Sequence, residues 1–298
     1  MRLPDLLFLT YLAPFFLVLS PPVSAQQTGT RHAVSYPSGE GELAYDVFLP
    51  TAYATDTLRR FPVIYWLHGT GGYPPGVVEM LAGRFNGAMA SGRIPPAVVV
   101  FLHDGSGSSL WVDDHAGTHP LESTIVQVLV PAVDSVYRTL ATPAGRLLEG
   151  GSMGGYGVAR LGFRYPDRFG AISMLSAGPL QPVLDPDDAP IVGADYARKI
   201  LDDVFGGNPA IFRSQSPWAL AETYAADPAH DLDLRMIVGG ADGIYANNLR
   251  FAGHLDSLGI AHEFTTLENV PHQPKALFAA LGDDYWTFIA DFLRAAGE

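Results

Sequence analysis

The stretch Gly150-Gly151-Ser152-Met153-Gly154 places a serine between glycines, after a short apolar run around Leu147 and Leu148 and before the helix-compatible run 156–165. This order predicts a strand, a tight turn and a helix, with Ser152 at the turn. Such a turn strains the serine backbone and needs small residues two positions before and after it, which Gly150 and Gly154 provide. The pattern G-x-S-x-G is therefore interpreted as a nucleophile elbow, and the alternative is a glycine-rich turn with an incidental serine.

Length and composition narrow the class of protein. The chain has 298 residues, of which 48% are hydrophobic and 16% charged, so one α/β domain with a large core is sufficient. It has no cysteine, which excludes disulfides, thiolate nucleophiles and cysteine-ligated metals. The formal net charge of −13 argues against a nucleic-acid partner or an anionic membrane surface, because the field of the protein would repel both.

The first residues have the pattern of a secretory signal. Arg2 precedes a mostly apolar run over 6–19, and Val23-Ser24-Ala25 offers the small residues that a signal peptidase recognises. We expect residues 1–25 to be a signal peptide cleaved after Ala25, leaving a catalytic domain over 26–298 that is secreted or periplasmic. The alternative, an N-terminal membrane anchor, is disfavoured because the run is shorter than the roughly 20 apolar residues that span a bilayer and contains Pro14.

The rest of the chain alternates between strand and helix patterns. Residues 32–50 alternate in polarity around 38–41, which predicts an antiparallel hairpin. Continuous apolar runs predict strands buried on both faces, and runs with helical periodicity separate them. The expected strands are 62–67, 97–102, 147–148, 171–175, 232–238 and 261–267; the expected helices are 77–89, 121–139 with Pro131 kinking or interrupting it, 155–165, 246–258 and 275–296.

This alternation predicts an α/β fold with a mostly parallel central sheet of about eight strands and helices on both faces. Residues 178–231 depart from the alternation: they begin rich in proline and aspartate and then show short helical pieces. We expect them to form a helical insertion after the sixth strand, lying over the carboxyl edge of the sheet.

A serine nucleophile needs a histidine to accept its proton and a carboxylate to orient that histidine. In this architecture both partners lie in loops after late strands, in the order serine, acid, histidine. Asp242 follows the strand predicted over 232–238, and His272 lies in the loop before the last helix. We therefore predict Ser152, Asp242 and His272 as the catalytic residues. The alternatives are a turn aspartate at 242 and a surface histidine at 272.

Other acids and histidines are less well placed. Three aspartates precede a strand and so belong at the opposite edge of the sheet: Asp227, Asp231 and Asp233. Three more lie in the irregular insertion: Asp185, Asp187 and Asp188. Among the histidines, His254 and His262 flank a helix and a strand, and His230 precedes a strand.

The glycine-rich stretch His68-Gly69-Thr70-Gly71-Gly72 ends a buried strand. The amide of Thr70, or that of Gly71, is a candidate to form an oxyanion hole with the amide of Met153. His68 is assigned a packing role. A further cluster, Asp113, Asp114, His115 and His119, has no strong metal-binding spacing, so neither a metal nor another cofactor is expected.

Together these motifs resemble the esterase D-like group of the α/β-hydrolase superfamily, which includes S-formylglutathione hydrolases, feruloyl and acetyl-xylan esterases, and antigen 85-type mycolyl transferases. The resemblance runs from about residue 44 to the end. It is carried by the segments 45–50, 62–69, 134–139, 151–157 and 165–170, and by Asp104-Gly105, Trp111, Asp113 and Glu122. The chain departs from the group around His272, where Val270-Pro271 and Gln273-Pro274 stand in place of a preceding glycine and a following aromatic residue, and this bears on the substrate.

The resemblance implies an exported serine esterase that hydrolyses carboxylic esters through an acyl-enzyme, with the triad named above and Trp111 as a substrate-binding residue. Its expected partner is a small-molecule or polysaccharide-linked ester, such as a feruloyl or acetyl ester of plant polysaccharides. After signal cleavage no stable membrane anchor is expected, and no oligomeric state is indicated. The alternatives are an acyltransferase that uses the same acyl-enzyme and a non-catalytic binding module on a hydrolase scaffold.

Overall fold

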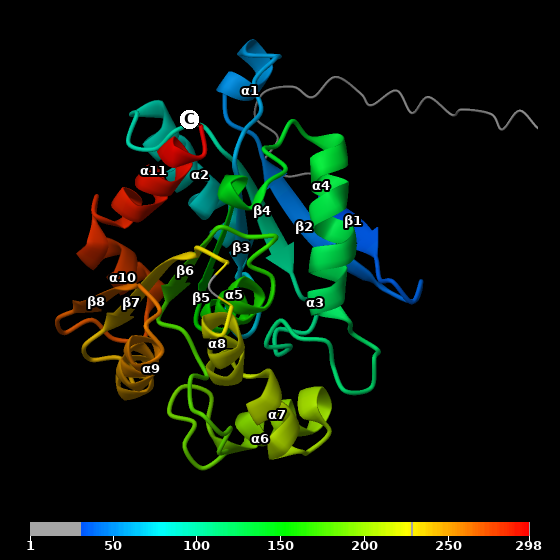
Figure 1. Cartoon of the computed structure of the whole chain (residues 1–298), viewed down its shortest axis with the longest axis vertical. Helices are drawn as coiled ribbons and strands as arrows, with labels where there is room; N and C mark the ends of the chain where they lie inside the picture. The colour runs from blue at the N-terminus through cyan, green and yellow to red at the C-terminus, as the bar shows by residue number, and fades with distance from the viewer. Residues whose placement is uncertain (1–30, 228, 298) are drawn as a thin grey trace, which may run out of the picture.

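Eight strands form one mixed sheet in a computed structural model that describes residues 31–227 and 229–297 (Figure 1). The order across the sheet is β1-β2-β4-β3-β5-β6-β7-β8, with β1 and β2 antiparallel and the others parallel. The strands are β1 (Arg31–Ser35), β2 (Glu42–Phe48), β3 (Val63–Leu67), β4 (Val98–His103), β5 (Arg146–Gly151), β6 (Ala171–Leu175), β7 (Asp233–Gly239) and β8 (Glu263–Leu267). The expected fold class is confirmed; the expected signal peptide lies outside the described residues.

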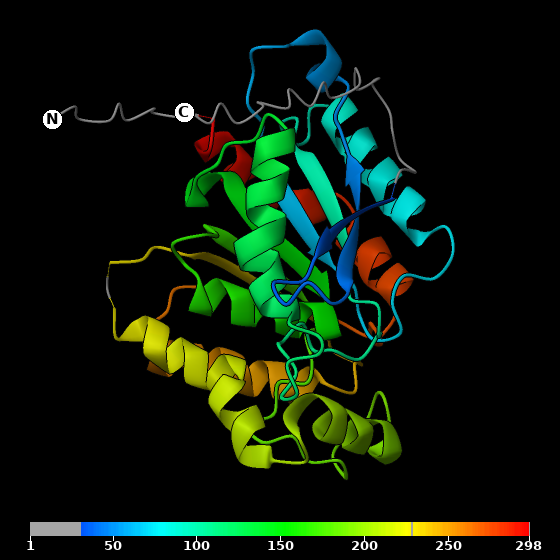
Figure 2. The same cartoon turned by 90° about the vertical axis from the view of Figure 1, so that its right-hand side faces the viewer.

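Helices cover both faces of the sheet (Figures 1 and 2). One face packs against α2 (Val77–Ala90), α10 (Pro274–Leu281) and α11 (Tyr285–Ala295). The other packs against α3 (Leu121–Thr124), α4 (Val130–Val136), α5 (Met153–Arg164) and α9 (Tyr245–Ser257). A short helix, α1 (Ala52–Thr55), joins β2 to β3.

The continuous apolar runs of the central strands are explained by these two layers. Side chains alternate between the faces of a strand, so a strand covered on both faces is apolar at every position. On β3, Tyr65 packs edge-on against Phe169 in one layer, whereas its neighbour Trp66 packs edge-on against Phe85 in the other.

The segment between β6 and β7 carries the helices α6 (Ala194–Phe205), α7 (Pro209–Gln215) and α8 (Pro217–Ala225). Figures 1 and 2 show these helices grouped at one end of the molecule. Trp218 of α8 contacts Phe251 of α9 and ties this group to the helical layer below. The helical group therefore adjoins the end of the sheet that carries the loop after β6.

Two expected helices are interrupted. The helix expected over 121–139 contains a π-helical segment, Ile125–Leu129, between α3 and α4. Pro131 explains this, because its ring lacks an N–H and crowds the preceding turn, and a wider turn relieves the crowding. The helix expected over 275–296 is two helices, separated at Gly282, whose φ of 52° ends α10.

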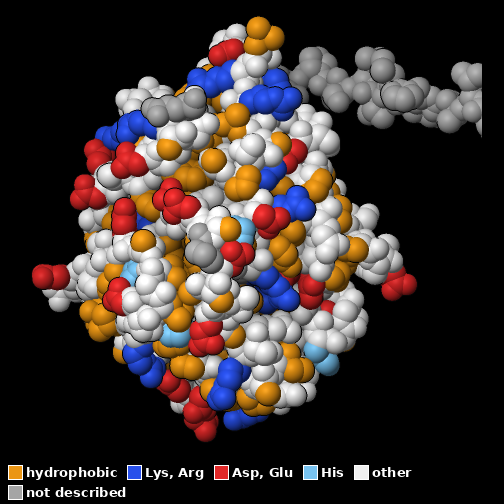
Figure 3. Space-filling model, viewed as in Figure 1, with side chains coloured by type: hydrophobic (Ala, Val, Ile, Leu, Met, Phe, Trp, Pro, Cys, Tyr) orange, Lys and Arg blue, Asp and Glu red, His pale blue; other side chains and the backbone are white. Residues whose placement is uncertain are grey.

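Acidic and basic side chains are interspersed over the face of the molecule shown in Figure 3, although the chain as a whole carries a formal charge of −13. Among residues 31–227 and 229–297, no helix combines the length and hydropathy needed to cross a bilayer.

Candidate active site

Ser152 lies at the carboxyl end of β5 in a strained turn. Its φ of 53° and ψ of −119° lie outside the ordinary regions for a side-chain-bearing residue. A Cβ on Gly154 would lie 2.0 Å from the carbonyl oxygen of Leu67, and a Cβ on Gly150 would lie 2.6 Å from the Gly154 carbonyl carbon. The two glycines therefore allow β3, β5 and α5 to approach one another, which presents the Ser152 side chain at the edge of the sheet.

The loops after β7 and β8 are joined to each other at this same edge. The Ala241 N–H donates to the Val270 oxygen at 3.1 Å, and the Gly240 N–H donates to the Leu267 oxygen at 2.7 Å. A Cβ on Gly239 would lie 2.0 Å from the Val270 oxygen, so the close approach requires glycine there. This contact brings the segment that carries Asp242 beside the segment that carries His272.

The structure brings Ser152, His272 and Asp242 into one hydrogen-bonded line. His272 Nε2 lies 3.0 Å from Ser152 Oγ, and His272 Nδ1 lies 2.8 Å from Asp242 Oδ2. With the Nδ1–H donating to the carboxylate, Nε2 is the free acceptor for the serine proton. The Asp242 side chain is 0% exposed and that of His272 is 18% exposed, so the line runs from the interior to the surface.

Asp242 combines this contact with a local turn. Its Oδ1 accepts from the Ile244 N–H at 3.0 Å while its Oδ2 faces His272. Burial alone would raise the pKa of Asp242, but the hydrogen bonds from His272 and the Ile244 N–H outweigh it and hold the pKa below its ordinary value. The carboxylate therefore stays ionised next to the imidazole.

The competing residues have other contacts. Asp233 begins β7 at the opposite edge, and Asp185, Asp187 and Asp188 are exposed in the segment after β6. His254 stacks on Trp218, His230 contacts Asp227, and His262 contacts the Ile260 oxygen.

The turn after β3 lies in close contact with Ser152. A Cβ on Gly69 would lie 3.2 Å from Ser152 Cβ. Thr70 and Gly71 each offer an amide of this turn as a possible oxyanion donor. The Gly71 N–H already donates to the Gly107 oxygen at 2.8 Å and is therefore not available. Met153 is the first residue of α5, where an N–H lacks an intrahelical acceptor. The amides of Thr70 and Met153 therefore stay the candidate donors to an oxyanion.

His68 and Asp104 hold this turn from below. His68 Nε2 accepts from the Asp104 N–H at 3.1 Å and lies 3.3 Å from Asp104 Oδ1. Burial alone would raise the pKa of Asp104, but the contact with His68, together with the hydrogen bonds from Ser109 and the Gly107 N–H, holds it far below its ordinary value. The turn therefore rests on an ionised, fully bonded carboxylate.

Trp111 was expected to contact substrate, but its side chain is 0% exposed. Its Nε1–H donates to the His68 oxygen at 3.1 Å, and a Cβ on Gly157 would lie 2.7 Å from its ring. The missing side chain at Gly157 makes room for the indole between α5 and the turn after β3. Its neighbour Leu110 lines the cavity at Ser152 instead.

A small cavity of about 50 Å³ opens beside Ser152. Its wall is mostly apolar and comes from the turn after β3, the loop after β4, the segment after β6, α6 and the residue that precedes α9. The lining residues are Thr70, Leu110, Ser152, Gly178, Pro179, Gln181, Leu184, Ala189, Pro190, Ile191, Val192, Ala197, Ile200 and Ile244. Sequence patterns did not indicate most of these residues, because the segment 178–192 has no periodicity that shows which side chains point inward.

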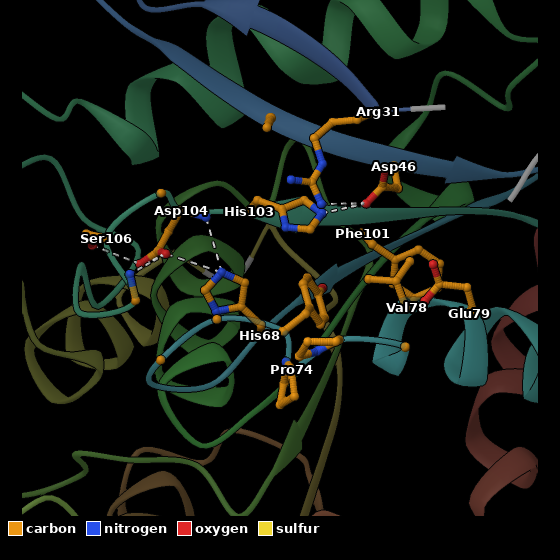
Figure 4. Close-up of a pocket in the computed structure, with 18 of the residues that line it drawn as sticks. Arg31, Asp46, His68, Pro74, Val78, Glu79, Phe101, His103, Asp104 and Ser106 are labelled. Atoms are coloured by element: carbon orange, nitrogen blue, oxygen red, sulfur yellow. Dashed lines mark hydrogen bonds and ion pairs between the residues drawn. The ribbon is translucent and has the colours of Figure 1, made fainter. Parts of the chain in front are cut away.

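A second cavity, of about 850 Å³, lies on the far side of the same turn (Figure 4). Gly71 and Gly72 line it, together with residues of β2, β4 and α2 such as Asp46, His103 and Glu79. Its buried polar groups are paired within the protein: His103 Nε2 lies 2.6 Å from Asp46 Oδ2, and Asp104 accepts from Ser106 and the Gly107 N–H. Ser152 does not line this cavity, so it is separate from the candidate active site.

The aspartates considered as metal ligands form hydrogen bonds that stabilise their own loop. Asp113 accepts hydrogen bonds from the N–H and hydroxyl of Ser123, and Asp114 accepts from the Thr118 hydroxyl and the His119 N–H. Among the described residues, no group of three or more His, Asp or Glu side chains is arranged to hold a metal ion.

Beneath the site, a second polar cluster that sequence patterns did not indicate joins β5, β6 and β7. Glu149 is 0% exposed; its Oε1 accepts from Ser173 at 2.9 Å and from Arg235 at 3.1 Å, and its Oε2 accepts from the Tyr285 hydroxyl at 2.8 Å. Arg235 also donates to the Tyr285 carbonyl at 2.7 Å. The cluster fastens together the strands that precede Ser152 and Asp242.

The parallel sheet, the serine at the strand–helix turn and the two loops at its carboxyl edge define the α/β-hydrolase fold. Solved structures share this architecture. A ferulic acid esterase superposes with a TM-score of 0.71 at 20% identity, covering 89% of this chain and 98% of its own. An S-formylglutathione hydrolase from Agrobacterium tumefaciens superposes with a TM-score of 0.68 at 20% identity, covering 88% and 94%.

The chain belongs to the esterase family described as "Putative esterase", which matches residues 38–269. An endo-1,4-beta-xylanase/feruloyl esterase of Xylanibacter ruminicola is 29% identical over 146 residues, and an esterase of Mycobacterium tuberculosis is 26% identical over 252 residues. These matches cover 46% and 73% of this chain. The chain spans 20% of the first relative's length and 50% of the second's.

Proposed function

We propose that this chain is a serine carboxylesterase with Ser152 as nucleophile, His272 as general base and Asp242 as the residue that orients His272. The observation that carries the proposal is the pair of contacts at 3.0 Å and 2.8 Å that link these side chains beside an apolar cavity. Family membership supports the same reaction class.

In the proposed mechanism, Ser152 Oγ attacks the ester carbonyl while His272 Nε2 accepts its proton. The amides of Thr70 and Met153 donate to the resulting oxyanion, and one such donor is typically worth about 3 kcal/mol in the transition state. His272 then donates the proton to the departing alcohol, and the C–O bond to the alcohol breaks. Water, activated by the same imidazole, attacks the acyl-enzyme and releases the acid.

The proposed substrates are feruloyl or acetyl esters of plant polysaccharides. The similarity to a xylanase/feruloyl esterase in sequence and to a ferulic acid esterase in structure supports the feruloyl ester. The cavity of about 50 Å³ is of a size for an acetyl group, which supports the acetyl ester. Comparing methyl ferulate, acetylated xylan and simple acyl esters separates these, and activity confined to simple short esters would exclude both polysaccharide classes.

We also propose that the protein is exported, because a substrate attached to a cell-wall polymer lies outside the cell. The expected signal peptide at 1–25 accounts for the export. N-terminal sequencing of the protein recovered from outside the cytoplasm is expected to begin at Gln26, and a mature chain that begins at Met1 would contradict cleavage.

The test of the nucleophile is Ser152→Ala. We expect it to reduce kcat for p-nitrophenyl acetate by about 10⁶-fold, because removing this nucleophile disables the other two residues as well. Ser135→Ala is the matched control: Ser135 is an exposed serine on α4, and its removal is expected to leave kcat unchanged. Hydrolysis by Ser152→Ala at the wild-type rate, with the fold intact by circular dichroism, would refute the proposal.

A further inference from the structure

Gln181 is a buried polar side chain in the wall of the apolar cavity at Ser152. It is 5% exposed, and of the described lining residues only Ser152 and Thr70 also carry polar side chains. The other walls are aliphatic, from residues such as Leu184 and Ile200. A polar group in such surroundings is costly unless it is hydrogen-bonded.

The orientation of the Gln181 amide follows from its neighbour. Its Nε2 donates to the Asp188 carbonyl oxygen at 2.7 Å. A carbonyl oxygen can only accept, so the NH₂ group must face Asp188 and Oε1 must be the other end. The backbone beside Gln181 is also anchored, because Trp218 Nε1 donates to the Leu180 oxygen at 2.9 Å.

Half of the amide is left without a hydrogen bond. Within residues 31–227 and 229–297, Gln181 Oε1 is buried and has no hydrogen-bond partner. A buried acceptor without a partner raises the free energy of the folded protein, and a donor supplied by a ligand recovers that loss. The larger cavity offers a contrast, because the carboxylates of Asp46 and Asp104 there are already bonded (Figure 4).

We propose that Gln181 is a specificity-determining residue, whose Oε1 accepts a hydrogen bond from a hydroxyl on the part of the ester that enters this cavity. The preferred substrates are then esters with a hydroxylated acyl or alcohol group rather than purely hydrocarbon ones. This inference rests on the proposed esterase function and adds the chemical class of the bound group. A site that hydrogen-bonds a substrate hydroxyl discriminates against the analogue that lacks it.

The test compares matched ester pairs that differ by one hydroxyl. The acyl arm uses glycolyl against acetyl esters and methyl 4-hydroxycinnamate against methyl cinnamate. The alcohol arm uses 4-hydroxyphenyl acetate against phenyl acetate. In at least one arm we expect kcat/KM of the wild type to favour the hydroxylated member by about tenfold, which corresponds to ~1.4 kcal/mol.

Two variants separate recognition from packing. Gln181→Met removes the acceptor at similar length, and we expect the hydroxyl preference measured for the wild type to fall by about tenfold, whatever happens to the absolute rates. Leu184→Met changes another wall of the cavity without touching the acceptor and is expected to keep the preference. Intrinsic differences in ester reactivity cancel when the same preference is compared between the wild type and a variant.

The outcomes are distinguishable. Equal preferences in the wild type and Gln181→Met in both arms, with the esters still hydrolysed, would overturn the role of Gln181 and leave the esterase proposal standing. If the wild type hydrolyses none of these esters, the esterase proposal fails.

Calorimetry of 4-hydroxycinnamate and cinnamate with Ser152→Ala tests Gln181 without turnover. Binding that favours the hydroxylated acid only when Gln181 is present would support its role, and equal binding of the two acids together with no hydroxyl preference in the alcohol arm would overturn it.

Discussion

Two carboxylate clusters lie along the same part of the sheet, one on the strands β5, β6 and β7 and the other in the turn and loops that follow β5, β7 and β8, and they differ in accessibility. In the inner cluster Glu149, three residues before Ser152 on β5, is enclosed by Ser173, Arg235 and Tyr285. In the outer cluster Asp242 contacts His272, which contacts Ser152 beside a cavity. Both contain a carboxylate, a nitrogen-containing side chain and a hydroxyl, but of the two only the outer one faces a space that a ligand can enter.

The two clusters differ in whether any of their polar groups is free to contact a substrate. Both oxygens of Glu149 accept hydrogen bonds from the protein, so the inner cluster connects β5, β6 and β7 and offers nothing to a substrate. In the outer cluster Asp242 is enclosed but Ser152 reaches the cavity wall. We therefore expect substitutions in the outer cluster to affect catalysis and substitutions in the inner cluster to affect stability.

The largest expected effect is that of His272→Gln. Removing the general base leaves Ser152 without a proton acceptor, so kcat for p-nitrophenyl acetate is expected to fall by about 10⁶-fold. His119→Gln is the control, because His119 is exposed and its polar side-chain contacts are with Asp114 and Thr118. A fall of less than tenfold for His272→Gln, measured by steady-state kinetics, would rule out His272 as the base.

The next effect is that of Asp242→Asn. An amide at this position disfavours the imidazole tautomer that donates from Nδ1, and kcat is expected to fall by about 10⁴-fold. Asp231→Asn, at the opposite edge of the sheet just before β7, serves as the control and should leave kcat as in the wild type. If both variants retained full activity, another acid would have to orient His272.

For the inner cluster we expect a loss of stability with little change in activity. Glu149→Gln leaves the buried Arg235 guanidinium without its counter-ion, which is expected to cost about 3–5 kcal/mol of unfolding free energy in urea titrations. The protein that remains folded should keep its kcat within about tenfold, since the cluster does not touch the cavity.

A double variant checks that the loss comes from the unpaired charge. Glu149→Leu combined with Arg235→Met replaces the pair with apolar side chains, and most of the stability is expected to return. A double variant as unstable as Glu149→Gln would show that the hydrogen bonds to Ser173 and Tyr285, rather than the ion pair, hold the strands together.

The smallest effect is on the pH dependence of stability, through Asp104. Its pKa in the folded protein lies below the unfolded value of about 3.9, so its contribution is fully present above that pH and is lost as the pH falls toward the folded pKa. Asp104→Asn is expected to cost about 1–3 kcal/mol at pH 7, and the difference from the wild type should shrink below about pH 4. Urea titrations at pH 3 and pH 7 measure it, and a difference equal at both would contradict it.

Much of the fold could be predicted from sequence because its strongest signals are local. Apolar runs such as 97–102 predicted strands covered on both sides, as β4 (Val98–His103) is, and the glycines around Ser152 predicted the elbow. The interruption of the helix expected over 121–139 was indicated by Pro131, but the end of α10 was not foreseen. The helix expected over 275–296 breaks at Gly282, whose positive φ ends α10.

The site was harder to predict wherever a role depends on contacts between distant segments. Trp111 is buried because Gly157 leaves room for its ring. No sequence pattern indicates that these two residues are in contact. Glu149 interrupts an apolar run, and its partner Arg235 lies on another strand. Gln181 lies in an aperiodic segment, so the unbonded oxygen on its side chain becomes evident only from the hydrogen bonds around it.

The role of Ser152 as nucleophile is tested most directly by covalent labelling of the purified protein with a fluorophosphonate, followed by peptide mass spectrometry. We expect one phosphonate per chain, attached to Ser152, with labelling strongly reduced in His272→Gln because the serine loses its base. Absence of labelling, or a phosphonate on a different serine while Ser152 remains unmodified, would contradict the claim that Ser152 is the nucleophile of this protein.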